Sequence, residues 1–158
     1  MTNFSFAVLI SGNGSNLQAM IDAIKGNQIY GKICCVLSNK EDAYGLQRAQ
    51  EVKIPTEVVS NKDFETREDF DTEMVRVLSI YNPDLVVLAG FMRILSPVFI
   101  NAFPGKILNI HPSLLPKYPG LNTHERVLES SDNIHGITVH FVDESLDGGP
   151  ICAQSSLE

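Results

Sequence analysis

Hydrophobic residues along this chain fall alternately into short continuous runs and into runs spaced for a helix. The first run, Phe6 to Ile10, is wholly apolar, which is typical of a strand covered on both faces. From Leu17 to Ile24, apolar residues then recur at the i, i+3, i+4, i+7 spacing of one helical face. The pattern therefore opens with a buried strand followed by an amphipathic helix.

The same alternation continues to the end of the chain. Further strands are predicted at 33–37, 56–59, 85–88, 107–110, 137–141 and 151–155, and further helices at 44–51, 66–81, 96–101 and 123–129. The predicted fold class is α/β, with an open, doubly wound, mostly parallel sheet and helices on both faces. Ligands of such sheets bind beyond the carboxyl ends of the strands, so we expect function in the loops that follow strands.

Length and composition narrow the class of protein. With 158 residues, 44% hydrophobic and 20% charged, the chain is predicted to form a single domain over 1–158. A net charge of −7 argues against nucleic acid or an anionic membrane as the main partner. Cys34, Cys35 and Cys152 have neither the number of a disulfide framework nor the spacing of a metal site. We expect no metal, a cytoplasmic location and three packing thiols.

Residues 11–16, which we call the glycine turn, follow the first predicted strand. Gly12 and Gly14 allow close backbone approach to a ligand, and the helix that follows offers free N–H groups to an anion. A plain tight turn with a helix cap is the alternative. Leu17 stands where a dinucleotide motif needs its third glycine, so a monophosphate fits better than a dinucleotide.

Asn109 and His111 form a second candidate site. Strand periodicity places both on one face of the predicted strand 107–110 and its end. An amide beside an imidazole is able to stabilise an oxyanion and to move a proton. The alternative is a satisfied core histidine beside a turn asparagine.

Asp147 lies in the third candidate loop, Leu146-Asp147-Gly148-Gly149-Pro150. A carboxylate beside an imidazole favours the protonated ring and holds its orientation, provided that the fold brings Asp147 to His111. A plain turn is the alternative, since Asp-Gly is a strong turn signal. Of the other histidines, His124 and His135 are expected at the surface and His140 as a buried structural residue. The acidic residues Glu65 to Glu73 are expected on the solvated side of a helix.

Four segments, at 8–18, 88–95, 109–116 and 146–150, resemble in order four motifs of one family. They are similar to the N-terminal loop, folate-pocket segment, catalytic signature and final loop of the phosphoribosylglycinamide formyltransferases of purine biosynthesis. The resemblance extends over essentially the whole chain and implies a Rossmann-like formyltransferase fold. The family continues well beyond residue 158, so the chain is expected to lack C-terminal elements of that fold and to be a C-terminally truncated domain.

The resemblance implies transfer of formyl from 10-formyltetrahydrofolate, as co-substrate, to the amine of glycinamide ribonucleotide. It assigns catalysis to Asn109, His111 and Asp147, and the ribonucleotide to Gly12, Asn13, Gly14, Ser15 and Asn16. It assigns the folate to Arg67, Met92, Arg93, Ile94, Leu95, Asn109, Asp143, Glu144, Ser145, Leu146 and Asp147. Residues 112–120, which we call the proline loop, are expected to act either as a lid or as a static connector.

The implied chemistry suits these residue types. Attack by the substrate amine builds negative charge on the formyl oxygen, which Asn109 and protonated His111 would stabilise while His111 moves a proton. Rival expectations keep the fold and use water or a charged tRNA as acceptor, or retain binding without catalysis; the net charge disfavours tRNA. The implied partners are small molecules, with the protein a monomer or homodimer.

Overall fold

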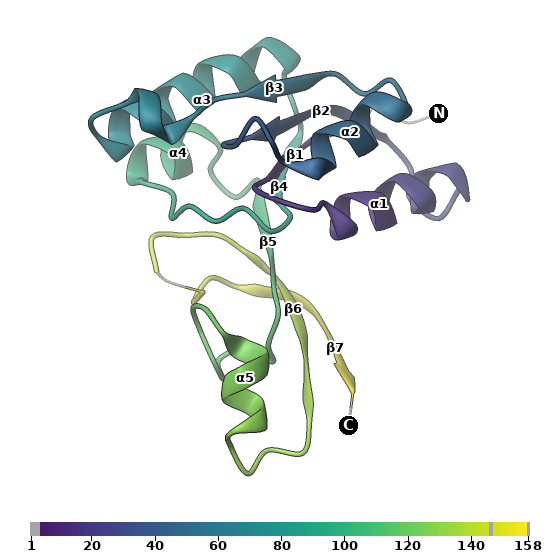
Figure 1. Ribbon diagram of the computed structural model, residues 1–158, viewed down its shortest axis with the longest axis vertical. Coiled ribbons are helices and arrows are strands. Elements are labelled where there is room, and N and C mark those ends of the chain that lie inside the picture. The colour runs from purple at the N-terminus through teal and green to yellow at the C-terminus, as the bar shows by residue number, and fades with distance from the viewer. Residues whose placement is uncertain (1–3, 146, 158) are drawn as a thin grey trace.

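The computed structural model describes residues 4–145 and 147–157, and strands and helices alternate through them (Figure 1). The elements in chain order are β1 (Ser5–Ile10), α1 (Ser15–Lys25), β2 (Lys32–Ser38), α2 (Tyr44–Glu51), β3 (Thr56–Val58), the 3₁₀ turn η1 (Asn61–Asp63), α3 (Arg67–Tyr81), β4 (Leu85–Leu88), α4 (Pro97–Ala102), β5 (Ile107–His111), α5 (Thr123–Leu128), β6 (His135–Phe141) and β7 (Ile151–Leu157).

All the strands join one sheet in the order β3-β2-β1-β4-β5-β6-β7. The first five run parallel to their neighbours, whereas β6 is antiparallel to β5 and β7 is antiparallel to β6. The predicted open, mostly parallel sheet is therefore confirmed. Because β1 and β4 lie side by side at its centre, their carboxyl ends bring the loops after Ile10 and Leu88 together.

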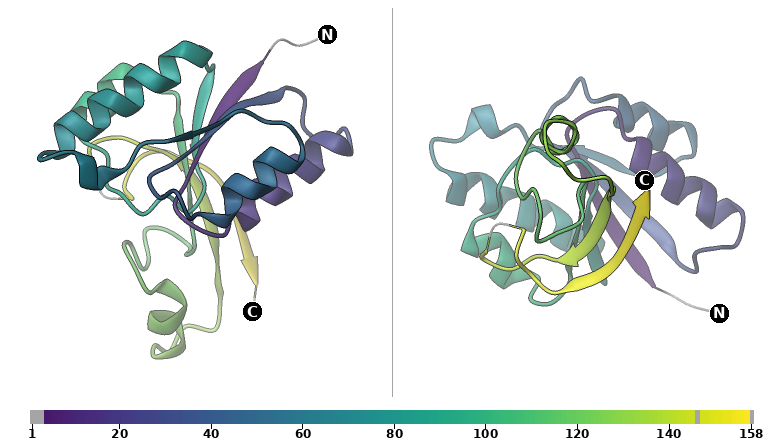
Figure 2. Two further views of the ribbon diagram at one scale, coloured as in Figure 1. Left: turned by 45° about the horizontal axis from the view of Figure 1, so that its top comes forward. Right: turned by 90° about the horizontal axis from the view of Figure 1, so that it is seen from below.

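Helices cover both faces of the parallel part (Figure 2). On one face, α1 and α2 bury Leu17, Ile21 and Leu46 against Val8, Ile10 and their neighbours. On the other face, α3 and α4 bury residues such as Phe70, Met74 and Phe99 against the opposite side of the same strands. All six residues of β1 are buried, which explains why Phe6 to Ile10 is a continuous apolar run rather than an alternating one.

The antiparallel strands and α5 extend away from this two-faced core (Figure 1). Beyond Ile107, only Leu115 and Val127 are buried hydrophobic residues among those that the structure describes. β7 is exposed from Ile151 to Ser156. None of the helices in the described part of the chain combines the length and apolar character that crossing a membrane requires.

Two expectations about burial are wrong. Asp71, expected on the solvated side of its helix, is 1% exposed and accepts a hydrogen bond from the Ser96 backbone N–H at 2.7 Å. Its position one residue after Phe70 turns it toward α4 rather than toward water. Cys152, expected as a packing thiol, is exposed because β7 is the last strand of the sheet.

Candidate active site

The side chains of Asn109, His111 and Asp147 meet at the carboxyl end of β5. Asn109 and His111 alternate along β5 and so point to the same side of the sheet. The loop between β6 and β7 places Asp147 Oδ1 3.6 Å from His111 Nδ1, with the two side chains only 10% and 6% exposed. The structure thus brings together three residues that lie up to 38 positions apart in the sequence.

The residue types of this loop suit its backbone path, which runs close to the end of β6. Asp147 has a positive φ of 53°, and Gly149 lies against the end of β6. A Cβ atom at Gly149 would lie 1.9 Å from the Phe141 carbonyl oxygen, so a side chain there would displace the loop. The Asp-Gly-Gly motif is therefore needed for backbone fit as well as for the carboxylate.

His140 is a fourth polar side chain in this cluster, although the sequence predicts only a buried structural role for it. Its Nδ1 lies 3.1 Å from the Phe141 carbonyl oxygen, which only accepts, so Nδ1 carries a proton. Its Nε2 is then free to accept from Asn109 Nδ2 at 3.3 Å, and it lies 3.8 Å from Asp147 Oδ1. The antiparallel pairing of Asn109 with His140 in the sheet produces this contact, which no strand periodicity reveals.

The proline loop lies against the cluster. His111 Nε2 donates to the Tyr118 carbonyl oxygen at 2.8 Å, and Asp147 Oδ2 accepts from the Gly120 N–H at 2.7 Å. The loop is itself anchored on β6, because the buried Thr138 hydroxyl donates to the Ser113 carbonyl oxygen and accepts from the Leu115 N–H. Whether the loop moves as a lid stays a prediction.

The glycine turn lines a cavity of about 330 Å³ at the carboxyl ends of β1 and β4. Each predicted ribonucleotide residue from Gly12 to Asn16 lines it. Gly14 precedes α1 in the left-handed conformation (φ 76°), and neither a capping side chain nor a first-turn acid occupies the start of that helix. The N–H groups there are therefore available to an anion. Lys40, from the loop after β2, also lines this cavity and was missed in the sequence analysis.

A hydrogen-bonded chain joins the glycine turn to the loop after β4. The Met92 N–H donates to Ser11 Oγ at 2.8 Å, and Ser11 Oγ donates to Asn39 Oδ1 at 2.6 Å. Asn39 Nδ2 in turn donates to Asn61 Oδ1 at 3.2 Å. Ser11 and Asn39 are buried, so these bonds set the relative positions of two of the loops around the cavity.

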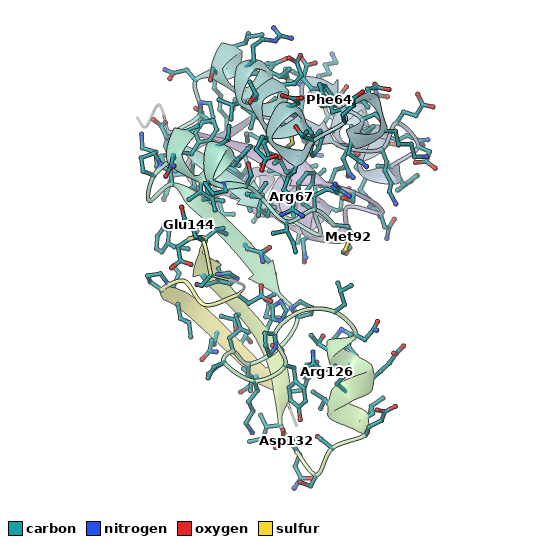
Figure 3. All side chains as sticks on the ribbon, turned by 90° about the vertical axis from the view of Figure 1, so that its left-hand side faces the viewer. Phe64, Arg67, Met92, Arg126, Asp132 and Glu144 are labelled. Atoms are coloured by element: carbon teal, nitrogen blue, oxygen red, sulfur yellow. The ribbon has the colours of Figure 1, made fainter. Side chains whose placement is uncertain are left out.

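Besides Arg67 and Asn109, the predicted folate residues form two segments, 92–95 and 143–147, and Met92 lines the cavity. Met92 and Ile94 are 62% and 61% exposed, whereas Leu95 is buried in the core. The Arg93 guanidinium lies 5.9 Å from the centre of the Phe70 ring. Figure 3 shows Arg67, at the start of α3, and Met92 on the side of the parallel part from which the antiparallel strands extend.

The second folate segment is the loop after β6. Asp143, Glu144 and Ser145 are exposed, and Leu146 lies outside the described residues. Hydrogen bonds from the Ser145 side chain and backbone N–H to Asp143 lower the pKa of the Asp143 carboxyl. This carboxylate therefore stays ionised and holds the loop in a turn.

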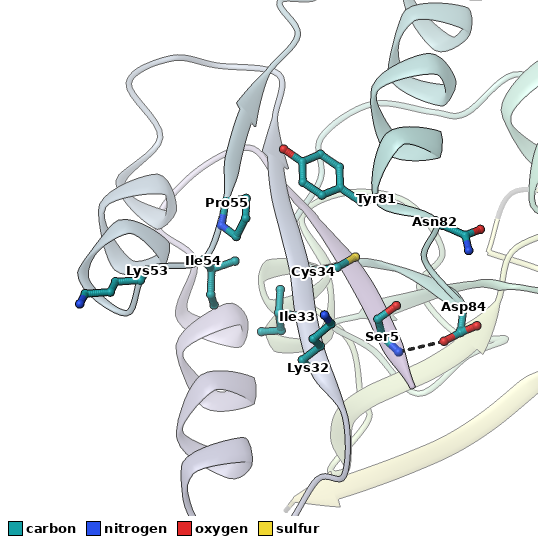
Figure 4. A pocket seen from close by; sticks show the side chains of 10 residues that line it. All are labelled: Ser5, Lys32, Ile33, Cys34, Lys53, Ile54, Pro55, Tyr81, Asn82 and Asp84. Atoms are coloured by element: carbon teal, nitrogen blue, oxygen red, sulfur yellow. Dashed lines mark hydrogen bonds between the residues drawn. The ribbon is translucent and has the colours of Figure 1, made fainter. Parts of the chain in front are cut away.

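A second, larger cavity of about 670 Å³ lies at the opposite, amino-terminal edge of the sheet (Figure 4). Its walls include Lys32, Cys34, Lys53 and Tyr81, and none of the predicted site residues. The cavity is therefore separate from the polar cluster and from the glycine turn, which lie beyond the carboxyl ends of the strands.

Together these features are typical of an α/β enzyme. The turn after β1 is able to bind an anion, and an imidazole and a carboxylate meet after β5. Both lie at the edge of the sheet where such folds bind ligands. A family model described as "Formyl transferase" matches residues 4–158. The chain belongs to the formyl transferase family.

Individual relatives indicate which members of this family the chain resembles. The phosphoribosylglycinamide formyltransferase of Escherichia coli is 55% identical over 153 residues, which cover 97% of this chain and 72% of that protein. The human "Trifunctional purine biosynthetic protein adenosine-3" is 48% identical over 151 residues, which cover 96% of this chain and 15% of that protein. The resemblance stated from the four sequence motifs is confirmed.

Solved structures agree with this result. A glycinamide ribonucleotide transformylase from Symbiobacterium toebii superposes with a TM-score of 0.95 at 42% identity, covering 98% of this chain and 73% of that chain. A phosphoribosylglycinamide formyltransferase from Coxiella burnetii superposes with a TM-score of 0.94 at 48% identity, covering 99% and 73%. The Rossmann-like formyltransferase fold is therefore confirmed.

Proposed function

We propose that this chain transfers the formyl group of 10-formyltetrahydrofolate to the amine of 5-phosphoribosylglycinamide, a step of purine biosynthesis. The products are formylglycinamide ribonucleotide and tetrahydrofolate. The observation that carries the proposal is the meeting of Asn109, His111 and Asp147 beside a cavity lined by the glycine turn. The similarity to a phosphoribosylglycinamide formyltransferase, which extends over 97% of this chain, supports phosphoribosylglycinamide as the acceptor.

The amine nitrogen attacks the formyl carbon, and the carbonyl electron pair moves onto oxygen. The Asn109 amide and the protonated His111 ring are the donors proposed to stabilise this oxyanion. When the intermediate collapses, the bond from carbon to the folate nitrogen breaks and the carbonyl re-forms. A proton passes from the amine to the departing nitrogen, with His111 as the group that carries it.

Asp147 would keep the His111 ring oriented and charged during these steps. His111 Nε2 donates to the Tyr118 carbonyl oxygen and its Nδ1 faces the Asp147 carboxylate, so both ring nitrogens have partners that hold the ring in one orientation. For His111 to reach a substrate through Nε2, the Tyr118 carbonyl oxygen has to give up this hydrogen bond. His140 accepts from the Asn109 amide. This hydrogen bond would fix the orientation of the amide, including its oxygen and its second N–H.

The two substrates would occupy adjoining parts of the site. We assign the ribonucleotide phosphate to the glycine turn, where N–H groups of α1 are free. We assign the folate to Arg67, to residues 92–95 and to the loop 143–147, where exposed apolar side chains such as Met92 and Ile94 offer a surface for a flat ring. We propose further that residues 1–158 act as one formyltransferase domain in the cytoplasm, where its three free cysteines would stay reduced.

A formyl-transfer assay that follows release of tetrahydrofolate, with and without the ribonucleotide, tests the proposal. We expect product only when the ribonucleotide is present. Product in its absence would indicate hydrolysis by water, and binding of both substrates without product would indicate a module that binds but does not catalyse. Either of these results would overturn the proposed function.

A further inference from the structure

Helix α2 lies directly against the glycine turn and not against the cavity that the turn lines. A Cβ atom at Gly14 would lie 2.7 Å from Gly45 Cα, and one at Gly45 would lie 2.4 Å from Ile10 Cδ1. Glycines at both positions therefore allow the backbone of α2 to approach the turn at van der Waals distance. α2 is close enough to control the shape of the turn.

Two successive carbonyl groups of the turn are bound by α2. The Gly12 carbonyl oxygen accepts from the Gly45 N–H at 3.0 Å, and the Asn13 carbonyl oxygen accepts from Arg48 Nε at 2.7 Å. In a trans peptide, the N–H points opposite to the C=O of the same unit. The N–H groups of Asn13 and Gly14 therefore point away from α2, the arrangement in which successive amides form an anion-binding nest.

Arg48 contributes more to this arrangement than one hydrogen bond. Its Nη2 donates to Asn13 Oδ1 at 3.1 Å, and its Nη1 donates to Gln18 Oε1 on α1 at 3.3 Å. The Tyr44 ring lies 4.8 Å from the guanidinium carbon and limits its movement. One planar side chain thus joins α2 to the glycine turn and to α1.

The charge of Arg48 is not neutralised by a neighbour. Within the described residues, no carboxylate lies at ion-pair distance from its guanidinium. A chain of net charge −7 therefore keeps an unpaired cation directly behind the glycine turn. Such a charge attracts an anion bound on the opposite side of the turn, even without direct contact.

We propose that Arg48 is a positioning residue for the phosphate of the ribonucleotide: it holds the glycine turn in its anion-binding form from outside the cavity. This inference rests on the proposed function and adds to it a residue that does not itself line the cavity. It applies equally to any phosphate-bearing ligand of the turn.

The test compares Arg48→Lys and Arg48→Met with Arg76→Met. Arg76 is the matched control, because it is an arginine on a helix surface, 64% exposed, and its ion-pair partner in the described part of the chain is Glu73. Binding of ribose 5-phosphate is measured by calorimetry, and KM and kcat for both substrates are measured by formyl transfer. Thermal unfolding of each variant reports whether the fold is retained.

Arg48→Met is expected to weaken ribose 5-phosphate binding and raise the KM for the ribonucleotide about tenfold or more, since charge-assisted hydrogen bonds are lost. Arg48→Lys keeps the charge but loses the planar guanidinium with its several N–H donors. Its affinity for ribose 5-phosphate and its KM for the ribonucleotide are therefore expected to lie between those of Arg48→Met and the unchanged protein. The KM for the folate and kcat should change less than twofold, and Arg76→Met should change nothing.

The inference and the proposed function fail in different ways. If the unchanged protein transfers no formyl group but binds ribose 5-phosphate in an Arg48-dependent manner, only the proposed function is wrong. If both Arg48 variants bind ribose 5-phosphate as tightly as the unchanged protein, the inference is wrong. If Arg48→Met does not fold, Arg48→Lys decides, and equal effects on kcat and both KM values would indicate a general structural role that contradicts the inference.

Discussion

At the scale of single residues, the hydrogen bonds around β5 constrain where protons lie. The Tyr118 and Phe141 carbonyl oxygens are acceptors only, so they place a proton on His111 Nε2 and on His140 Nδ1. His140 Nε2 lies 3.3 Å from Asn109 Nδ2, while His111 faces the Asp147 carboxylate. The backbone partners of the two histidines thus place their protons on different ring nitrogens.

Asn109→Ala tests the proposed oxyanion donor. We expect kcat to fall about 10²–10³-fold, which is the usual cost of removing one such donor. Asn109 is only partly buried, so the melting temperature should change by a few degrees at most. Steady-state kinetics and thermal unfolding check this, with Asn133→Ala, an exposed loop substitution, as control. Near-normal turnover in Asn109→Ala would rule out its proposed role.

Cys34 lies in the wall of the larger cavity, at an irregularity of β2 (Figure 4). Phe6 pairs with Ile33 and Ala7 with Cys35, so Cys34 is an extra residue in the strand. A hydrogen bond with the Cys35 side chain lowers the pKa of Cys34 from 9.0 to about 7, although burial acts in the opposite direction. A reactive thiolate is therefore expected at neutral pH.

The prediction for Cys34 is a pH profile of alkylation. The rate of Cys34 modification by iodoacetamide, followed by peptide mass spectrometry, should rise with a midpoint near pH 7. Cys35→Ala removes the hydrogen bond and should move this midpoint toward 9. Cys152, exposed on β7, serves as the internal control for reagent access. A midpoint that stays the same in Cys35→Ala would show that the bond has no effect.

At the scale of elements, α3 and α4 are joined by a buried carboxylate. Asp71 Oδ2 accepts from the N–H of Ser96, the N-cap residue of α4, while Asp71 Oδ1 and Ser96 Oγ have no partner among the described residues. Burial raises the pKa of Asp71 above its usual 3.8, although Ser96 and the charge of Arg67 oppose this. The contact orients the end of the segment 92–95 that we assign to the folate.

The raised pKa of Asp71 predicts how stability depends on pH. Because the folded state holds this proton more tightly than the unfolded state, the contribution of Asp71 to the free energy of unfolding is complete below about pH 3.8. It declines as pH rises through the raised pKa. Asp71→Asn cannot ionise, so its stability relative to the unchanged protein should improve between pH 3 and neutrality.

Urea unfolding of both proteins at several pH values measures this difference. Asp69→Asn is the control, since Asp69 is exposed on the first turn of the same helix. If the stability difference between Asp71→Asn and the unchanged protein does not vary with pH, the carboxyl does not titrate abnormally and the prediction is wrong.

At the scale of the whole molecule, the candidate site lies at the boundary between two unequal parts. Both hydrophobic clusters lie around β1 to β5 with helices α1 to α4. His111 ends the last strand of that part, whereas His140 and Asp147 belong to the antiparallel extension, which has few buried apolar residues. The geometry of the candidate site therefore depends on a less strongly packed region.

Hydrogen exchange should reveal this difference in packing. Amide protons of β1 and β4 are expected to exchange slowest, close to global unfolding, because these strands are buried on both faces. Those of α5 and β7 are expected to exchange at least tenfold faster. Amide protons of β6 that pair with β5 provide an internal comparison with those of β7. Equal protection of all amide protons across the molecule would contradict the prediction.

Much of the fold was predictable because its signals are local. The limits of α2 and β4 were predicted without error, since a strand covered on both faces must be continuously apolar and a helix must repeat its apolar face. Asn109 and His111 were predictable as a pair because they lie two residues apart on one strand. His140 and Arg48 were not, because their partners Asn109 and Asn13 are distant in sequence, and Lys40 was not, because only the fold brings it to the cavity.

By itself, the sequence determined the order of strands and helices, the family motifs and the chemical groups available at the ends of β1 and β5. These depend on neighbours within a few residues, where steric and hydrophobic preferences act directly. The tertiary structure alone decided that Asp147 reaches His111, that Asp71 is buried, and that Arg48 lies behind the glycine turn. Such contacts depend on strand pairing and helix packing over the whole chain, which no local pattern encodes.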